Sequence, residues 1–168
     1  MIAALHGRVR RFGNDINTDY IISSKRKRET IDDEVLTQWL LEGVDPAFAA
    51  SVRAGDLIVA GRNFGCGSAM EVAVTVILAA GIRAVLAESF SRTFFRNAIN
   101  NGLIPVQCDT TRLGEGDRLE FELADGRFAG RNRSSGESLF SAPFSGIALD
   151  ILEAGGLVPY VLQHGGLG

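Results

Sequence analysis

A glycine-rich segment, Gly61–Ser68, contains the groups in this sequence that are best suited to chemistry. It joins the end of an apolar run, Leu57–Ala60, to the start of a segment with helical spacing. Glycines let the backbone approach a ligand closely, and the unpaired N–H groups and the dipole at a helix start attract anions. We therefore expect a phosphate or carboxylate group to bind at this turn, where ligands bind in open α/β folds.

Ser68 ends the glycine-rich segment, and the same field would stabilise an ionised oxygen on this serine, so that it can act as a base. The alternative is that Ser68 is simply the N-cap of the next helix and the glycines form a tight turn. The two histidines, His6 and His164, lie near the chain ends and leave little room for a Ser-His-Asp triad. The segment also lacks the Gly-Lys-Ser/Thr sequence of the Walker phosphate-binding loop.

The elements that must position Ser68 follow from hydrophobic spacing. Three buried strands are predicted, and they alternate with two helices: Leu57–Ala60, Ala69–Ala80, Arg83–Ala87, Ser89–Asn101 and Ile104–Cys108. Because parallel neighbours need crossovers of this length, the order predicts a right-handed, parallel βαβαβ core. Gly81 and Gly102 are placed to end the two helices in the left-handed conformation.

The flanking segments predict further elements. They are a strand at Gly7–Phe12, a polar loop over Asn14–Asp19, a helix at Ile31–Leu41 capped by Thr30, an antiparallel hairpin of Leu119–Leu123 with Arg127–Ala129, a helix at Ile147–Ala154 and an edge strand at Leu157–Val161. Pro159 favours an edge position, since it cannot donate to a ladder. The glycine-rich tail, residues 164–168, is expected to be loose.

The composition limits the class of protein. A chain of 168 residues with 46% hydrophobic residues forms one domain, residues 1–168, with a core of normal size, and it is not disordered. The 17 basic and 20 acidic residues give a net charge of −3, which does not favour nucleic acid or an anionic membrane as a partner. No apolar run reaches the length of a membrane span and no signal-peptide core is present, so a cytoplasmic location is expected.

Three motifs occur in order along the chain, at Asp15–Ile22, Gly55–Ser68 and Ser89–Ala98. They resemble the small subunit of 3-isopropylmalate dehydratase (isopropylmalate isomerase), the homoaconitase small subunit and the swivelling domain of aconitase. The resemblance extends from Gly7 to about Val161. Together with the strand pattern, it implies an α/β fold, a single swivel-type domain with a βαβαβ parallel core and a small antiparallel hairpin.

The resemblance implies a hydro-lyase subunit of leucine biosynthesis that is active only with a large subunit. In this family the large subunit holds a [4Fe-4S] cluster that acts as a Lewis acid on the substrate. Cluster binding takes three cysteines and this chain has two, Cys66 and Cys108, so it is expected to bind no cofactor itself. The resemblance assigns Ser68 as the base that removes a carbon-bound proton from a small hydroxy-dicarboxylate, which is dehydrated and then rehydrated.

The resemblance also places substrate contacts outside the glycine-rich segment. Thr18 and Asp19 match a Thr-Asp pair at the edge of the family's active site, with an Asx-type turn as the alternative. Arg28 falls in a loop that contacts the variable part of the substrate. Alternatively, Lys25–Arg28 is a solvated basic run, and the loop Ser23–Thr30 is expected to be mobile.

Gly65, Cys66 and Gly67 are expected to contact the substrate as the backbone of the anion-binding turn, with Cys66 interpreted as a small packing residue rather than a nucleophile. Arg92 and Arg96 are four residues apart on one helix face. They can reach the substrate or an acid on the partner subunit, but pairing within the chain is the preferred interpretation.

The chain departs from the family directly after Ser68. The family reads Gly-Ser-Ser-Arg-Glu-His-Ala here, whereas this chain has Ala69 in place of the second serine and Met70 in place of the arginine. In the family that arginine grips a substrate carboxylate, and loss of such a pair costs roughly 1.5–3 kcal/mol. The usual substrate is therefore expected to bind poorly unless Arg28 or another cation substitutes, and a smaller or more apolar hydroxy-dicarboxylate is the expected substrate.

Two other classes of function remain open from the sequence. A stand-alone anion-binding α/β module would use the same glycine-rich turn without a partner. An inactive or regulatory paralogue would keep the fold and the large subunit but lack turnover, which the altered residues Ala69 and Met70 make credible.

Overall fold

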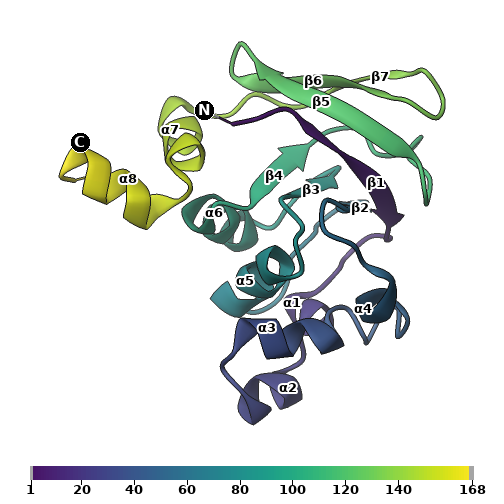
Figure 1. Ribbon diagram of the computed structural model, residues 1–168, viewed down its shortest axis with the longest axis vertical. Coiled ribbons are helices and arrows are strands. Elements are labelled where there is room, and N and C mark those ends of the chain that lie inside the picture. Colours follow the sequence, from purple (N-terminus) through teal and green to yellow (C-terminus); the bar gives the residue numbers. More distant parts are fainter. Residues whose placement is uncertain (1, 167–168) are drawn as a thin grey trace.

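The computed structural model describes residues 2–166, and its centre is a seven-stranded sheet with the order β4-β3-β2-β1-β5-β6-β7 (Figure 1). The strands are β1 (Leu5–Arg11), β2 (Leu57–Ala60), β3 (Ala84–Ala87), β4 (Ile104–Gln107), β5 (Arg118–Ala124), β6 (Arg127–Asn132) and β7 (Ser138–Phe140). β1 to β4 are parallel, whereas β5, β6 and β7 continue from the other edge of β1 in antiparallel order. β1 therefore joins a parallel and an antiparallel half.

The helices lie on the side of the parallel half of the sheet, but not all of them pack on it (Figure 1). They are α1 (Thr18–Ile21), α2 (Ser24–Glu29), α3 (Asp33–Leu36), the 3₁₀ turn η1 (Thr37–Trp39), α4 (Phe48–Ser51), α5 (Glu71–Ala79), α6 (Arg92–Asn101), α7 (Gly146–Ala154) and α8 (Leu157–His164). The order β2-α5-β3-α6-β4 confirms the predicted parallel βαβαβ core, which β1 extends by a fourth strand. Gly81 and Gly102 have positive φ angles of 86° and 81° where the helices end, as predicted.

Each central strand is buried on both faces, because alternate residues enter two separate cores. In β2, Ile58 lies in the core shared with α1, α3, α4, α5 and one face of α6, while Leu57 and Val59 lie in the core shared with the antiparallel half, the other face of α6, α7 and α8. In β3, Val85 and Leu86 divide in the same way. Burial on both faces fixes the position of β2 in the sheet. It thereby also fixes the carboxyl end of β2, where the glycine-rich segment begins.

The predicted helix over Ile31–Leu41 is shorter than expected. Regular helix spans only Asp33–Leu36, and the chain then tightens into η1. Asp32, not Thr30, is the N-cap, since its side chain accepts a hydrogen bond from the N–H of Glu34. Ile31 lies outside the helix and is 97% exposed, so the apolar residue that appeared to start the helical face does not pack.

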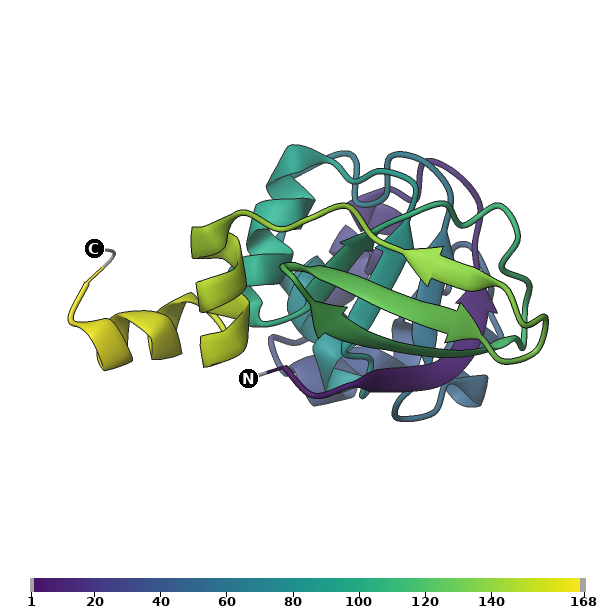
Figure 2. The same ribbon diagram turned by 90° about the horizontal axis from the view of Figure 1, so that it is seen from above.

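The predicted edge strand at Leu157–Val161 is wrong, because these residues begin α8. Pro159 is the third residue of that helix, in the first turn, where an N–H group has no intrahelical acceptor and its loss is harmless. Figure 2 shows α8 extending away from the sheet. His164 ends this helix and Gly165 caps it in the left-handed conformation, whereas 167 and 168, the end of the tail expected to be loose, lie outside the described residues.

Other predicted elements agree with the structure. The hairpin of β5 and β6 is present, and β7 adds a third antiparallel strand that the sequence pattern does not predict. α7 matches the predicted helix within one residue. Over residues 2–166 no single helix is long and apolar enough to cross a membrane. Only α7 and α8 counted together have that length and composition, and the two helices meet at a bend of 93°.

Candidate active site

The glycine-rich segment Gly61–Ser68 leaves the carboxyl end of β2 between the segments that follow β1 and β3. On one side, the N–H of Gly65 donates to the carbonyl of Ile16 at 2.8 Å. On the other side, the N–H of Phe64 donates to the carbonyl of Ser89 at 3.0 Å, and Ser91 Oγ donates to the carbonyl of Gly65 at 2.9 Å. The parallel order of the strands thus continues beyond their ends and fixes the segment from both sides.

Two glycines of this segment have positive φ angles, and neither position has room for a side chain. Gly65 has φ +80°, and a Cβ here would overlap the ring of Phe94 on α6. Gly67 has φ +92°, and a Cβ here would lie 2.6 Å from Oδ1 of Asn17. Glycine is therefore required by both backbone conformation and packing, which makes the turn a close-fitting scaffold for the residue that ends it.

Ser68 is exposed at the end of this turn. Its carbonyl accepts a hydrogen bond of 2.8 Å from Thr18 Oγ1, while its own hydroxyl has no hydrogen-bond partner among the described residues. The next helix, α5, begins at Glu71, and Met70 is its N-cap. The alternative interpretation of Ser68 as an N-cap is therefore wrong, and the predicted start of the helix at Ala69 is two residues too early. The helix N-terminus lies two residues farther from Ser68 than expected.

Thr18 and Asp19 begin α1, and Thr18 contacts the same turn. The N–H of Thr18 donates to the carbonyl of Cys66 at 2.8 Å, and Thr18 is buried. Asp19 is exposed, and its Oδ1 accepts two hydrogen bonds of 3.0 Å from the N–H and Oγ of Ser24. The predicted Asx-type turn is present, but Asn17 makes it, through a bond of 2.8 Å from the N–H of Asp19 to Asn17 Oδ1. Thr18 is thus placed to hold the Ser68 backbone, and Asp19 to face solvent at its edge.

Comparison with known proteins identifies the family. Residues 11–111 match the aconitase C-terminal domain family. The chain belongs to this family. It is 43% identical over 163 residues to the isopropylmalate/citramalate isomerase small subunit of Methanocaldococcus jannaschii, covering 96% of this chain and 95% of that protein. It is 45% identical over 163 residues to the methanogen homoaconitase small subunit of Methanothermobacter thermautotrophicus, covering 97% and 94%.

A solved structure supports the same assignment. The crystal structure of a 3-isopropylmalate dehydratase from Methanocaldococcus jannaschii matches this fold with a TM-score of 0.90 at 39% identity, covering 97% of this chain and 96% of that chain. The resemblance drawn from the three sequence motifs is confirmed, and so is the α/β fold class. The chain is a small-subunit member of the aconitase family, of the isopropylmalate isomerase and homoaconitase type.

The basic run Lys25–Arg28 was expected to lie in a loop, but in the structure it forms part of α2. Arg26 attaches α2 to the body: its Nε lies 2.9 Å from Glu42 Oε1, and its guanidinium lies 4.5 Å from the ring centre of Trp39. Lys27 Nζ lies 2.7 Å from Met70 Sδ. Arg28 is exposed and forms no ion pair within residues 2–166. Lys27, rather than Arg28, is therefore the member of the run that contacts the residues after Ser68.

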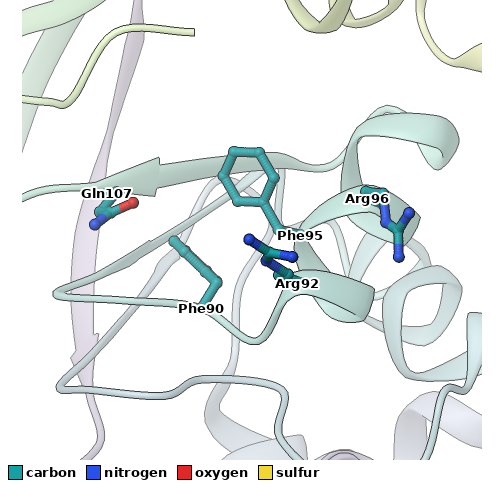
Figure 3. A pocket seen from close by; sticks show the side chains of 5 residues that line it. All are labelled: Phe90, Arg92, Phe95, Arg96 and Gln107. Atoms are coloured by element: carbon teal, nitrogen blue, oxygen red, sulfur yellow. The ribbon is translucent and has the colours of Figure 1, made fainter. Parts of the chain in front are cut away.

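Arg92 and Arg96 lie on the exposed face of α6, beside a cavity of about 430 Å³ that is also lined by Phe90, Phe95 and Gln107. Figure 3 shows Arg92 on the side of Phe90 and Gln107, with Arg96 extending away from them. In the described part of the chain neither arginine forms an ion pair, so the preferred interpretation of pairing within the chain is wrong. Both cations remain open to an outside group.

The two cysteines are free thiols with raised pKa values. Partial burial, and secondly the charge of Asp15, raises the pKa of Cys66, and deeper burial raises that of Cys108 to about 12. A thiol that stays protonated is a poor nucleophile, which agrees with the interpretation of Cys66 as a packing residue. Within residues 2–166 no three His, Cys, Asp or Glu side chains are placed to hold one metal ion.

The structure also identifies a positioning residue that the sequence interpretation missed. Ser91 caps α6, since its side chain accepts a hydrogen bond from the N–H of Phe94, and the same hydroxyl donates to Gly65. A serine three residues before an apolar helical position is a signal for the cap. No sequence signal indicates its second bond, because that bond joins segments 26 residues apart.

Proposed function

We propose that this chain is the small subunit of a heteromeric hydro-lyase that removes water from a small hydroxy-dicarboxylate and adds it back. The observation that carries the proposal is the end-to-end similarity, at 43–45% identity, to proteins named as small subunits of isopropylmalate/citramalate isomerase and homoaconitase. Such names imply a large subunit as the partner. The chain accordingly contributes one wall of an active site that the partner completes.

In this proposal Ser68 is the base. Its ionised Oγ accepts the proton from the substrate carbon, the carbon–hydroxyl bond breaks and a carbon–carbon double bond forms; rehydration returns the proton from the serine hydroxyl. Three features support this role: the hydroxyl is exposed, it has no partner among residues 2–166, and the Thr18 hydrogen bond holds its backbone. The N–H groups of Gly67 and Ser68 and the nearby start of α5 favour negative charge at this place.

The proposed large subunit holds a [4Fe-4S] cluster, which supplies a Lewis acid for the departing hydroxyl. The donor set of this chain does not fit such a cluster. Its two cysteines, Cys66 and Cys108, are one too few for three thiolate ligands, and Cys108 is buried. We therefore assign to this chain the proton transfer, through Ser68, and contacts to the substrate, through the turn Gly65–Gly67, Thr18, Asp19 and Arg28.

The test is to co-express the chain with candidate large subunits and reconstitute the cluster without oxygen. Turnover of 3-isopropylmalate, citramalate and related hydroxy-dicarboxylates is followed by the absorbance of the unsaturated diacid. We expect copurification and turnover with at least one substrate, and a loss of at least a hundredfold in kcat in Ser68→Ala. Ser138→Ala, an exposed serine on β7 outside the candidate active site, serves as the control.

The altered residues Ala69 and Met70 favour one competing function, an inactive subunit that keeps the partner. Copurification without turnover of any substrate would support that function and contradict ours. Failure to copurify, together with tight anion binding by the isolated chain, would instead support the stand-alone binding module.

A further inference from the structure

Lys27 is a cation held next to the catalytic turn without an acidic partner. Its Nζ lies 2.7 Å from the thioether sulfur of Met70, two residues after Ser68. The side chain is half-buried, and within residues 2–166 it forms no ion pair. Lys27 lines a cavity of about 400 Å³ together with Asp33 and Glu71. Neither carboxylate comes within 4 Å of the Lys27 ammonium. The charge of Lys27 is therefore not neutralised within the described chain.

The contact with Met70 is a poor match for an ammonium group. A thioether is a weak hydrogen-bond acceptor, whereas a lysine ammonium has three donors and prefers an anion. At most one donor points at the sulfur, so the other two remain available to a ligand at the surface of the turn. A partly buried cation with only a neutral partner favours the binding of a carboxylate, which adds charge-assisted hydrogen bonds.

The neighbouring residue explains why Lys27 can hold this position. Arg26 uses its own charge to attach α2 to Glu42, and it stacks on Trp39. Ser23 and Asp19 fix the start of α2 by hydrogen bonds to the N–H groups of Arg26 and Ser24. The helix is thus anchored by other side chains, and Lys27 is not needed to hold it. The fold therefore holds the Lys27 ammonium in place without pairing it with an acidic group in the described chain.

We propose that Lys27 binds one carboxylate of the substrate beside Ser68, and thereby supplies the positive charge that position 70 lacks because Met70 is neutral. This rests on the proposed hydro-lyase function and names a substrate-binding residue for it. The ligand class is a dicarboxylate in which one carboxylate lies next to the carbon that loses its proton. Lys27 then acts on substrate binding more than on proton transfer.

The experiment uses the reconstituted complex with the large subunit and four variants of this chain. Lys27→Met removes the charge at similar length, Lys27→Arg keeps it, Lys25→Met is a control on the exposed side of the same helix, and Lys27→Met with Met70→Arg moves the charge to the contacting position. Two experiments are made on each variant. Calorimetry gives the dissociation constant for citraconate, an unsaturated dicarboxylate, and steady-state kinetics give kcat and KM for citramalate and 3-isopropylmalate.

We expect Lys27→Met to weaken citraconate binding and to raise KM by about 10- to 100-fold, because losing one charge-assisted hydrogen bond lowers affinity by about this factor. The change in kcat should be smaller. Lys27→Arg and Lys25→Met should stay within about threefold of the unaltered complex, and Met70→Arg should restore most of the binding lost in Lys27→Met. Thermal unfolding checks that α2 is intact in each variant.

Two outcomes would overturn the proposal in different ways. If the unaltered complex turns over a substrate and Lys27→Met binds citraconate equally well, Lys27 has no role in binding while the hydro-lyase function stands. If the unaltered complex neither binds nor turns over any dicarboxylate, the proposed function fails, and the role of Lys27 fails with it.

Discussion

Replacement of Gly65 by alanine should damage the candidate active site through one contact. A methyl group at this position would overlap the ring of Phe94, which is buried. Overpacking of this kind costs about 1–3 kcal/mol, and the left-handed φ of +80° adds about 1–2 kcal/mol for any residue other than glycine. We therefore expect Gly65→Ala to lower the free energy of unfolding by about 2–5 kcal/mol, a large part of the stability of a domain of this size.

Gly136→Ala is the matched control. Gly136 has almost the same backbone angle, φ +81°, but an added Cβ would meet no atom within 4 Å. The two variants share the backbone contribution, so the difference between their unfolding free energies in urea isolates the overlap with Phe94, and it should be about 1–3 kcal/mol. Equal destabilisation of the two variants would refute the steric argument.

The same substitution should affect turnover beyond its effect on stability. Gly65 accepts the hydrogen bond of Ser91, so movement away from Phe94 displaces the turn that carries Ser68. A displacement of about 1 Å lowers rates on the order of a hundredfold. The double variant Gly65→Ala with Phe94→Leu, which makes room for the methyl group, should recover part of both the stability and the rate.

Three further predictions concern other parts of the fold. Burial alone would raise the pKa of Asp56, but hydrogen bonds from arginine side chains and a backbone N–H hold this pKa below its usual value near 4. The ionised carboxylate therefore stabilises the fold fully at pH values above about 4, and this stabilisation is lost as the pH falls through the lowered pKa. Asp56→Asn should therefore lower stability at pH 7 by about 3 kcal/mol and flatten the acid branch of the unfolding curve. Alkylation by iodoacetamide at pH 8, followed by mass spectrometry, should leave Cys108 unmodified in the folded chain and modify Cys66 more slowly than a free thiol, since both pKa values are raised. Thr18→Val should cost about 1 kcal/mol of stability by removing the hydrogen bond to the Ser68 carbonyl, and kcat should fall because the backbone of Ser68 is held less firmly.

The parallel core could be predicted because its signals are local and repeated. Leu57–Ala60 is an unbroken apolar run between a turn and a glycine, and β2 occupies these residues in the structure. The residues of the turn follow for the same reason, since a glycine-rich strand-to-helix connection is recognisable at short range. The start of α5 could not be placed as well, because Ala69 and Met70 are as compatible with a helix as Glu71 is.

Elements that depend on distant contacts could not be predicted. Leu157–Val161 has a composition that suits either an edge strand or a helix, and the choice depends on packing: Tyr160 of α8 is buried in the core around Ile151 and Leu152 of α7. The strand β7 exists because Ala129 and Gly130 of β6 offer a free edge. Neither partner is visible in the local pattern of the segment concerned.

The basic run shows the same limit within the candidate active site. The four consecutive charged residues Lys25–Arg28 suggested a solvated segment, because a charge pattern does not show which residues of the fold face it. In the fold Arg26 faces Glu42 and Trp39, and that pairing turns the run into a helix that places Lys27 against Met70. The sequence shows separately that a neutral residue, Met70, follows Ser68 and that cations are abundant at 25–28. Only the contact between Lys27 and Met70 joins the two observations, and from it follows the expectation that the charge lost at one position is supplied by the other.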